Sequence, residues 1–206
     1  KVIYLLKNRN DIDLIATGKG ENRLIEKGGY KYISLDITNE KLVYNVVEKE
    51  APDAIIHCAA MTNVDACEVD RVNCWLVNVT SVKFIAQSAE KIGAHLLHIS
   101  TDFVFDGESG PYSEKDTPNP LHYYAESKLA SEKIVSENSS NWAIIRTIII
   151  YGITDNMSRS NLVLWSKGEI EKGNTIKVVN DQYGTPTNTE KVADFIIKII
   201  TSLPKK

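Results

Sequence analysis

Residues 94–107 read Ala-His-Leu-Leu-His-Ile-Ser-Thr-Asp-Phe-Val-Phe-Asp-Gly. The apolar first half of this stretch predicts a buried strand, as parallel sheets covered on both faces contain. Ser100 and Thr101 follow the apolar run, so two hydroxyl groups stand at the carboxyl end of the strand. Parallel α/β sheets bind their ligands at that end of the strands. We therefore expect a ligand site at Ser100 and Thr101.

A phenol and an amine follow about two dozen residues later, in the segment Tyr124-Ala-Glu-Ser-Lys128. On a helix, positions four apart lie on one face, one turn apart. This spacing occurs by chance in many helices, but here it follows the hydroxyl pair. A free phenol titrates near ~10, and a nearby ammonium favours the phenolate. Lys128 is thus expected to lower the pKa of Tyr124 toward the range of efficient general acid catalysis, with Thr101 or Ser100 holding the substrate oxygen.

The remaining sequence alternates between strand and helix patterns. Strands are expected at residues 13–17, 31–35, 53–58, 94–100, 142–151 and 175–179, and helices at residues 1–9, 39–49, 67–92, 122–137, 161–172 and 189–202. This alternation predicts an α/β fold with a doubly wound parallel sheet of the Rossmann type. The family resemblance described below implies that residues 1–151 form the dinucleotide-binding domain, and residues 152–206 part of a small substrate-binding subdomain with interleaved Rossmann elements.

The sequence lacks the glycine-rich turn with which a dinucleotide site begins. Gly18-Lys19-Gly20 does not fit that turn, because no helix follows in register. The helix pattern at residues 1–9 is the one expected to follow such a turn. We therefore expect a first strand and a turn of the form Gly-x-x-Gly-x-x-Gly to precede Lys1.

Composition excludes several classes of protein. The 206 residues carry a net charge of −3, which argues against nucleic acid or an anionic membrane as the main partner. No apolar run reaches the ~18 residues of a membrane span. The three cysteines fit neither a disulfide framework nor a metal motif, which favours a reducing cytosol, and Cys58 is expected to be buried. The four histidines are not spaced as metal ligands, so no metal site is expected.

Three linked motifs carry a family resemblance. They are residues 59–65 (Ala-Ala-Met-Thr-Asn-Val-Asp), residues 100–107 quoted above, and residues 180–187 (Asn-Asp-Gln-Tyr-Gly-Thr-Pro-Thr). With Tyr124 and Lys128, they resemble the extended branch of the short-chain dehydrogenase/reductase superfamily. Within that branch, the chain is most similar to the dTDP-4-dehydrorhamnose reductase family, over nearly all of its length.

The resemblance assigns expected roles to the strand ends. At Thr17-Gly18-Lys19 no carboxylate stands where NAD enzymes bind the ribose, which favours NADP(H) over NAD(H). Asp36-Ile37 would meet the adenine, although Asp36 could equally be a turn residue before the next helix. Cofactor contacts are expected at Thr17, Lys19, Asp36, Ile37, Cys58, Ala59, Ala60, Thr62, Tyr124 and Lys128. Substrate contacts are expected at Val64, Thr101, Asp102, Tyr124, Ile149, Gln182 and Thr185.

Two positions bear on the reaction and on the sugar. Related sugar-nucleotide dehydratases carry Thr-Asp-Glu where this chain has Thr101-Asp102-Phe103, so the missing acid favours simple reduction over loss of water. Bacterial reductases of the rhamnose pathway often carry Trp where this chain has Ile149, which leaves the sugar open.

The resemblance implies NADPH-dependent reduction of a keto group on a nucleotide-linked sugar. Tyr124 would donate the proton, and Lys128 would also hold the nicotinamide ribose. Two alternatives stay open: a nucleotide-sugar epimerase with retained NAD, and a non-catalytic NADP-binding regulatory subunit. The expected partner is the nucleotide-sugar substrate, without nucleic acid or membrane; a homodimer stays open, and the expected location is the cytoplasm.

Overall fold

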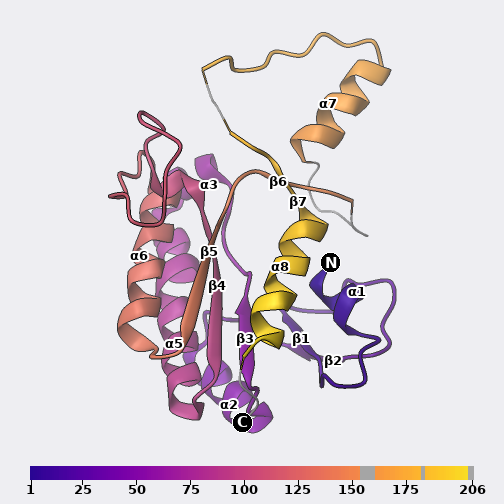
Figure 1. Ribbon diagram of the computed structural model, residues 1–206, viewed down its shortest axis with the longest axis vertical. Helices are drawn as coiled ribbons and strands as arrows, with labels where there is room; N and C mark the ends of the chain where they lie inside the picture. The colour runs from indigo at the N-terminus through magenta and orange to yellow at the C-terminus, as the bar shows by residue number, and fades with distance from the viewer. Residues whose placement is uncertain (154–160, 182–183, 204–206) are drawn as a thin grey trace. The chain divides into compact units, whose positions relative to one another are not determined.

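The computed structural model describes residues 1–153, 161–181 and 184–203. They divide into two compact units (Figure 1). One unit comprises Lys1–Ile33 and Ile148–Ser202, and the other comprises Ser34–Thr147 and takes in Leu203.

The second unit is built on a parallel three-stranded sheet in the order β3-β4-β5. Its strands are β3 (Ala54–His57), β4 (His95–Thr101) and β5 (Trp142–Thr147). Thr101 pairs with Thr147, so β4 and β5 end level, whereas the last residue of β3, His57, pairs with His98, three residues before the end of β4. This sheet confirms the predicted α/β fold with parallel strands.

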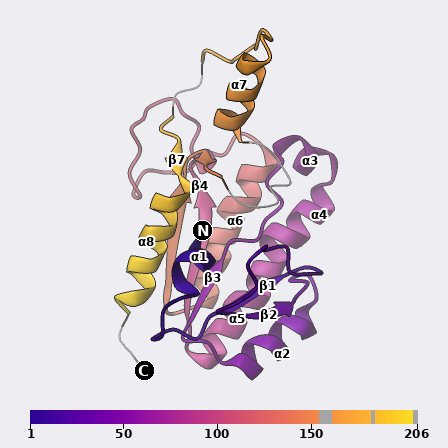
Figure 2. The same cartoon turned by 90° about the vertical axis from the view of Figure 1, so that its right-hand side faces the viewer.

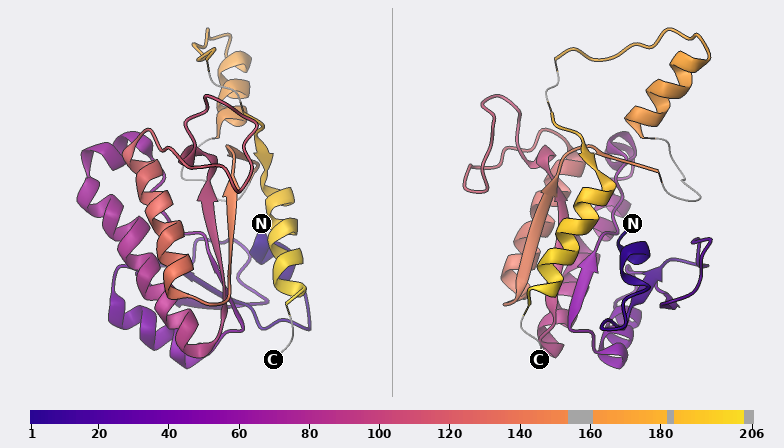
Figure 3. Two further views of the ribbon diagram at one scale, coloured as in Figure 1. Left: turned by 60° about the vertical axis from the view of Figure 1, so that its left-hand side comes forward. Right: turned by 45° about the vertical axis from the view of Figure 1, so that its right-hand side comes forward.

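Helices α2 (Glu40–Glu50), α5 (Ser81–Ile92) and α6 (Tyr123–Asn138) cover one face of that sheet (Figure 3). Their apolar side chains form the main core with those of β4. Its buried members are Leu35, Val43, Val47, Val82, Ile85, Ala86, Ala89, Ala94, Leu96 and Val135. Asn39 caps α2 by accepting a hydrogen bond from Leu42 N at 3.1 Å, and Gly93 ends α5 in the left-handed region at φ 67°. These two signals lie where the sequence places the helix ends.

The single long helix expected over residues 67–92 is wrong. The chain forms α3 (Val64–Val69), α4 (Arg71–Trp75), the π-helical turn η1 (Leu76–Thr80) and then α5 (Figure 2). Asp70 separates α3 from α4 with φ −117° and ψ 68°, and its carboxylate accepts a hydrogen bond from Asn73 N at 3.0 Å. An acid that caps the following turn competes with continuous helix, and hydrophobic periodicity does not register this competition.

The first unit holds two short strand pairs and three helices among its described residues. The pairs are β1 (Ile15–Gly18) with β2 (Lys31–Ser34) and β6 (Ile150–Tyr151) with β7 (Thr187–Asn188). The helices are α1 (Val2–Leu6), α7 (Leu162–Glu171) and α8 (Thr189–Thr201). Helices α1 and α8 are in contact, and Lys1 Nζ lies 3.2 Å from Glu190 Oε1.

Three further expectations are corrected. The strand expected over residues 142–151 ends at Thr147, and β6 is a separate strand after Ile149, whose φ is 21°. Residues 175–179 form no strand; Val178 and Val179 are exposed, and among the described residues nothing pairs with them. Residues 101–121, for which neither a helix nor a strand was expected, begin with the 3₁₀ turn η2 (Asp102–Val104), which the Thr101 hydroxyl caps by accepting a hydrogen bond from Phe103 N at 3.3 Å.

Two expectations stay predictions. The first strand and glycine-rich turn before Lys1 concern residues outside the printed sequence. The division into residues 1–151 and 152–206 is a functional assignment and stays a proposal. Among the described residues, no helix is long and apolar enough to cross a membrane.

Candidate active site

The end of β4 and the first turn of α6 bring Thr101 and Tyr124 together. His122 caps α6 through its Nδ1, which accepts from Ala125 N at 3.2 Å, and Tyr124 follows in the first turn. The Thr101 hydroxyl acts on the phenol by hydrogen bonding in the direction that lowers the pKa of Tyr124. Burial acts in the opposite direction and is the larger effect, so the pKa of Tyr124 is raised to about 12. At neutral pH the phenol is therefore protonated.

Aromatic rings and two thiols hold the Tyr124 ring in place. The rings of Phe103 and His122 lie 6.4 and 6.0 Å from it, centre to centre. Tyr124, Cys67 and Cys74 form a small buried cluster, against which the predicted substrate residue Val64 packs. The phenol is thus fixed by packing on several sides, as an acid that must meet one atom requires.

Lys128 lies deeper than expected and does not lower the pKa of Tyr124 in this structure. Its Nζ donates to the carbonyl oxygen of Ile99 at 2.7 Å and lies 3.1 Å from His98 Nε2. Only 3% of the residue is exposed, and burial lowers the pKa of its own ammonium to about 8. The expectation that Lys128 shifts the phenol is corrected accordingly: burial of the phenol governs the pKa of Tyr124.

Two buried histidines lie beside Lys128. The rings of His57 and His98 are stacked, with centres 5.3 Å apart. Burial, and then the Lys128 charge, lowers the pKa of His57 to about 3 and lowers that of His98 further. Both imidazoles are therefore neutral at physiological pH.

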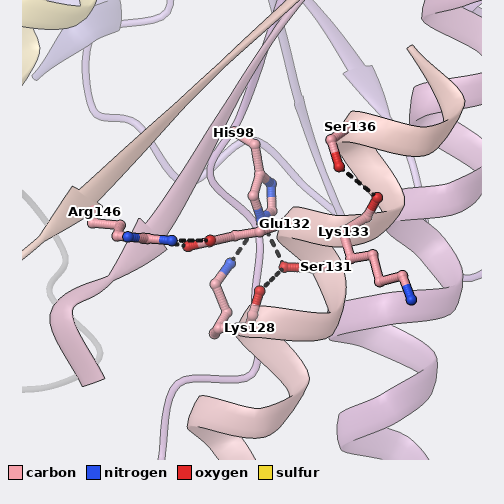
Figure 4. Close-up of polar contacts among 7 residues, drawn as sticks. All are labelled: His98, Lys128, Ser131, Glu132, Lys133, Ser136 and Arg146. Atoms are coloured by element: carbon pink, nitrogen blue, oxygen red, sulfur yellow. Dashed lines mark hydrogen bonds and ion pairs between the residues drawn. The ribbon is translucent and has the colours of Figure 1, made fainter. Parts of the chain in front are cut away.

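Figure 4 shows that Lys128 points toward His98, while Glu132, one turn further along α6, points toward Arg146 of β5. Arg146 Nε and Nη2 donate to the two carboxylate oxygens of Glu132 at 3.0 and 2.7 Å. This bidentate pair occupies both oxygens of the carboxylate that lies one turn after Lys128 on α6. Glu132 therefore acts on Lys128 through its charge, which raises the pKa of the amine, and no direct bond between the two is formed in the structure.

Asp102 and Ser100 flank Thr101. The Thr101 hydroxyl lies 3.2 Å from Asp102 Oδ1, to which it donates, and burial raises the pKa of Asp102. Ser100 is buried, and its hydroxyl has no hydrogen-bond partner among the described residues. The predicted hydroxyl pair is thus present, but only Thr101 is in contact with Tyr124.

The turn after β3 is open and made of small residues. Cys58, which we expected to be buried, is exposed, as are Ala59 and Thr62. Ala60 is half-buried. The small side chains at residues 58–60, at the carboxyl end of a parallel strand, fit the close approach of a dinucleotide.

Asn78 fixes the next residue of that turn. Its Oδ1 accepts from Met61 N at 2.8 Å, and its Nδ2 donates to Met61 O at 3.0 Å and to Ser127 Oγ at 3.0 Å. Asn78 lies in the middle of the π-helical turn and is fully buried. One side chain therefore ties the turn after β3 to both η1 and α6.

The remaining predicted positions have separate environments. Asp36 Oδ1 accepts from Thr38 N and Thr38 Oγ1 at 3.0 and 2.7 Å, as its turn alternative requires, and Ile37 packs against the main core. Four of the other predicted positions belong to the first unit: Thr17, Lys19, Ile149 and Thr185. Gln182 lies outside the described residues.

Sequence reasoning missed His98 and Ser131. His98 Nε2 lies 2.9 Å from Ser131 Oγ, and both residues are fully buried. Two signals were available: Ser131 stands three positions after Lys128 on the same helix face, and His98 is a polar residue inside an apolar strand. No group of three or more metal-ligating side chains is found in the described ranges.

The family model described as the RmlD substrate binding domain matches residues 3–206. The chain belongs to this family. The predicted resemblance to extended short-chain dehydrogenase/reductases of the dTDP-4-dehydrorhamnose reductase type is confirmed.

The chain is also similar to individual proteins, two of which are named as dTDP-4-dehydrorhamnose reductases. The chain is 40% identical over 161 residues to the dTDP-4-dehydrorhamnose reductase of Salmonella typhimurium, covering 77% of this chain and 52% of that protein. The crystal structure of dTDP-4-dehydrorhamnose reductase from Bacillus anthracis in complex with NADP is similar with a TM-score of 0.80 and 32% identity, over 93% of this chain and 72% of that one. Methionine adenosyltransferase 2 subunit beta of Bos taurus is 31% identical over 163 residues, covering 79% of this chain and 49% of that protein. The chain spans about half the length of several of the curated relatives it matches.

Proposed function

We propose that this chain carries the catalytic Tyr and Lys of an NADPH-dependent reductase that acts on the keto group of a nucleotide-linked sugar. The observation that carries the proposal is the position of Tyr124 in the first turn of α6, with its ring 6.4 Å from that of Phe103 and the Thr101 hydroxyl near enough to lower its pKa. A protonated phenol and a hydroxyl thus stand together at the carboxyl end of β4, where both could act on one carbonyl oxygen. The names of the RmlD-family relatives point to dTDP-4-dehydrorhamnose as the substrate.

The residues act on the oxygen of the keto group. Thr101 donates a hydrogen bond that orients the oxygen, and the Tyr124 hydroxyl supplies the proton as negative charge develops there. The high pKa of Tyr124 does not prevent this step, because an alkoxide is a much stronger base than a phenolate. Asp102, which accepts the Thr101 hydroxyl hydrogen in the absence of substrate, must release it when the keto oxygen is bound.

The residues present fit a nicotinamide dinucleotide, which when bound supplies the hydride. We assign Ala59, Ala60 and the neighbouring Cys58 as the residues that the dinucleotide would approach closely, because their side chains are small and those of Cys58 and Ala59 are exposed. Lys128 would hold the ribose and Thr62 the nicotinamide side. Asp36 and Ile37 would meet the adenine, and Thr17 and Lys19 the additional phosphate that distinguishes NADP(H) from NAD(H). The NADP named with the Bacillus anthracis structure supports this choice.

Substrate contacts are assigned to the side of Tyr124 away from the core. Val64 and Asp102 lie with Tyr124 in the second unit, whereas Ile149, Gln182 and Thr185 are assigned from the family motifs alone. We keep residues 1–151 as the cofactor-binding part and residues 152–206 as part of the substrate-binding part. The three free cysteines fit a cytoplasmic location, and a homodimer stays open.

The test is consumption of NADPH by the purified protein when dTDP-4-dehydrorhamnose is added, followed by absorbance. We expect turnover that needs fresh NADPH for each product, and Tyr124→Phe as the inactive control. Product formation without net NADPH consumption, with NAD retained through purification, would favour the epimerase.

A regulatory subunit is the second candidate, favoured by the relative that is named as a subunit of methionine adenosyltransferase. On that reading, the chain binds NADP and changes the activity of a partner enzyme, and the intact Tyr124 and Lys128 serve binding only. NADPH binding without turnover of any keto-sugar nucleotide in a panel would support it.

A further inference from the structure

The hydrogen bonds around Lys128 specify which hydrogens the buried groups carry. Ser131 Oγ donates to the carbonyl oxygen of Lys128, three residues earlier, at 2.7 Å. Ser127 and Ser136 do the same on α6, donating to the carbonyls of Tyr124 and Lys133 at 2.7 and 3.0 Å. A hydroxyl has one hydrogen, so a serine that donates to its helix carbonyl can only accept from a further partner.

Ser127 provides the precedent within this helix. Its oxygen accepts from Asn78 Nδ2, a group that can only donate, because Asn78 Oδ1 already accepts from Met61 N. By the same count, Ser131 Oγ accepts from His98 Nε2 at 2.9 Å. His98 is then the tautomer with hydrogen on Nε2, and its Nδ1, which has no partner among the described residues, carries a lone pair. This leaves no buried N–H of His98 unsatisfied.

The consequence falls on Lys128, whose Nζ lies 3.1 Å from the same Nε2. Because the hydrogen on Nε2 is donated to Ser131 Oγ, Nε2 has no lone pair that could accept a hydrogen bond from an ammonium, and its N–H repels the hydrogens of an ammonium more than it repels a free amine. Figure 4 shows Lys128 and Ser131 on the same side of α6, both directed at the His98 ring. We propose that Ser131 and His98 are positioning residues that favour the free-amine form of Lys128, Ser131 by fixing the tautomer and His98 by presenting its Nε2–H.

The other charged and titratable groups around Lys128 do not supply this effect. Glu132 and Cys58 favour the ammonium, and Glu132 is bonded to Arg146 of β5. His57 stacks on the far side of His98 and is neutral. Burial lowers the pKa of Lys128 to about 8. The hydrogen on His98 Nε2 lowers the pKa of Lys128 in the same direction. This inference deepens the proposed reductase site, since it concerns the charge of the residue assigned to the ribose.

The test is NMR of the full chain labelled with ¹³C and ¹⁵N in lysine, with the Lys128 side-chain signals followed across pH and assigned by Lys128→Met. In Ser131→Ala the imidazole is free to turn its lone pair toward Nζ, so the pKa of Lys128 should rise by about one to two units, the worth of a hydrogen bond to a charged group. His98→Gln, which can present an oxygen to Nζ, should raise it as well. Ser127→Ala is the matched control, because it removes the equivalent hydroxyl one turn earlier, and should leave Lys128 unchanged.

The tautomer is measured independently by two-bond ¹H–¹⁵N correlation of the histidine rings, with His98→Gln for assignment. Hydrogen on Nε2 of His98 is expected; hydrogen on Nδ1 would overturn the proposal. The proposal would also be overturned if the pKa of Lys128 were unchanged or lowered in Ser131→Ala and in His98→Gln. If Ser131→Ala does not fold, the pKa of Lys128 in His98→Gln alone decides between these outcomes. Neither measurement needs substrate, so a protein that reduces no sugar nucleotide would count against the proposed function and leave this test intact.

Discussion

Tyr124→Phe removes one oxygen from the candidate site and leaves the ring. Its packing against Cys67, Cys74 and Phe103 is retained, so the fold should lose only the hydrogen bond with Thr101. That loss costs about 1 kcal/mol of stability. Turnover should fall by about two to four orders of magnitude, the range for one general acid–base group. This fall corresponds to about 3–5 kcal/mol of barrier, well above the change in stability.

The assay compares three quantities for the same protein: turnover from NADPH absorbance, cofactor binding from NADPH fluorescence, and stability from urea unfolding. Tyr123→Phe is the matched control, because Tyr123 contacts Arg71 and Trp75 rather than Thr101. It should keep near-normal turnover. The reasoning is refuted if Tyr124→Phe turns over at nearly the wild-type rate, or if both variants lose activity equally.

Three further predictions concern binding, packing and pH. NADPH should bind more tightly than NADH, and Lys19→Glu should weaken NADPH selectively, as fluorescence titration would show; equal or stronger NADH binding in the wild type would contradict the assignment. Glu132→Gln should lower the free energy of unfolding in urea by about 2 kcal/mol, because it leaves the partly buried Arg146 without its charged partner. The control, Glu137→Gln, breaks an exposed pair with Lys133 at 3.7 Å and should lower it by less than about 0.5 kcal/mol. The free energy of unfolding should fall between pH 7 and pH 5, by about 2 kcal/mol for each of the two buried neutral histidines, His57 and His98. In the unfolded chain each imidazole takes up a proton below its ordinary pKa of ~6.5, whereas in the folded chain burial keeps it neutral. His98→Gln should remove about half of this loss, and an unchanged pH dependence would show that His98 is charged or exposed in solution.

The parallel sheet was predictable because its strands carry continuous apolar runs and its helices end at strong local signals. Asn39 and Gly93 mark helix ends in the sequence as they do in the structure. The break at Asp70 was missed because apolar spacing continues across it, and only the side-chain hydrogen bond to Asn73 distinguishes a cap from an exposed helical acid. Residues 175–179 have strand-like composition, but a strand also requires a neighbour with which to pair, and sequence composition does not provide one.

The sequence predicts which residues form the candidate site better than it predicts what shifts their pKa values. Tyr124 and Thr101 meet as expected, because a strand end and a helix start carry them. The effect of Lys128 on the phenol was not predictable from spacing alone. Four positions on a helix place two side chains on one face, but burial and the bonds to Ile99 and His98 decide where the amine lies.

The π-helical turn Leu76–Thr80 has a consequence for helix α4, which precedes it without a break. A π turn holds one residue more than an α turn, so it shifts the rotational phase of the helix by about 100°. Cys74 of α4 is thereby carried around the axis relative to the face that α5 presents to the core. One extra residue in the helix therefore rotates its first turns relative to its later turns. As a result, the later turns pack against the main core while Cys74 in the first turns faces Tyr124.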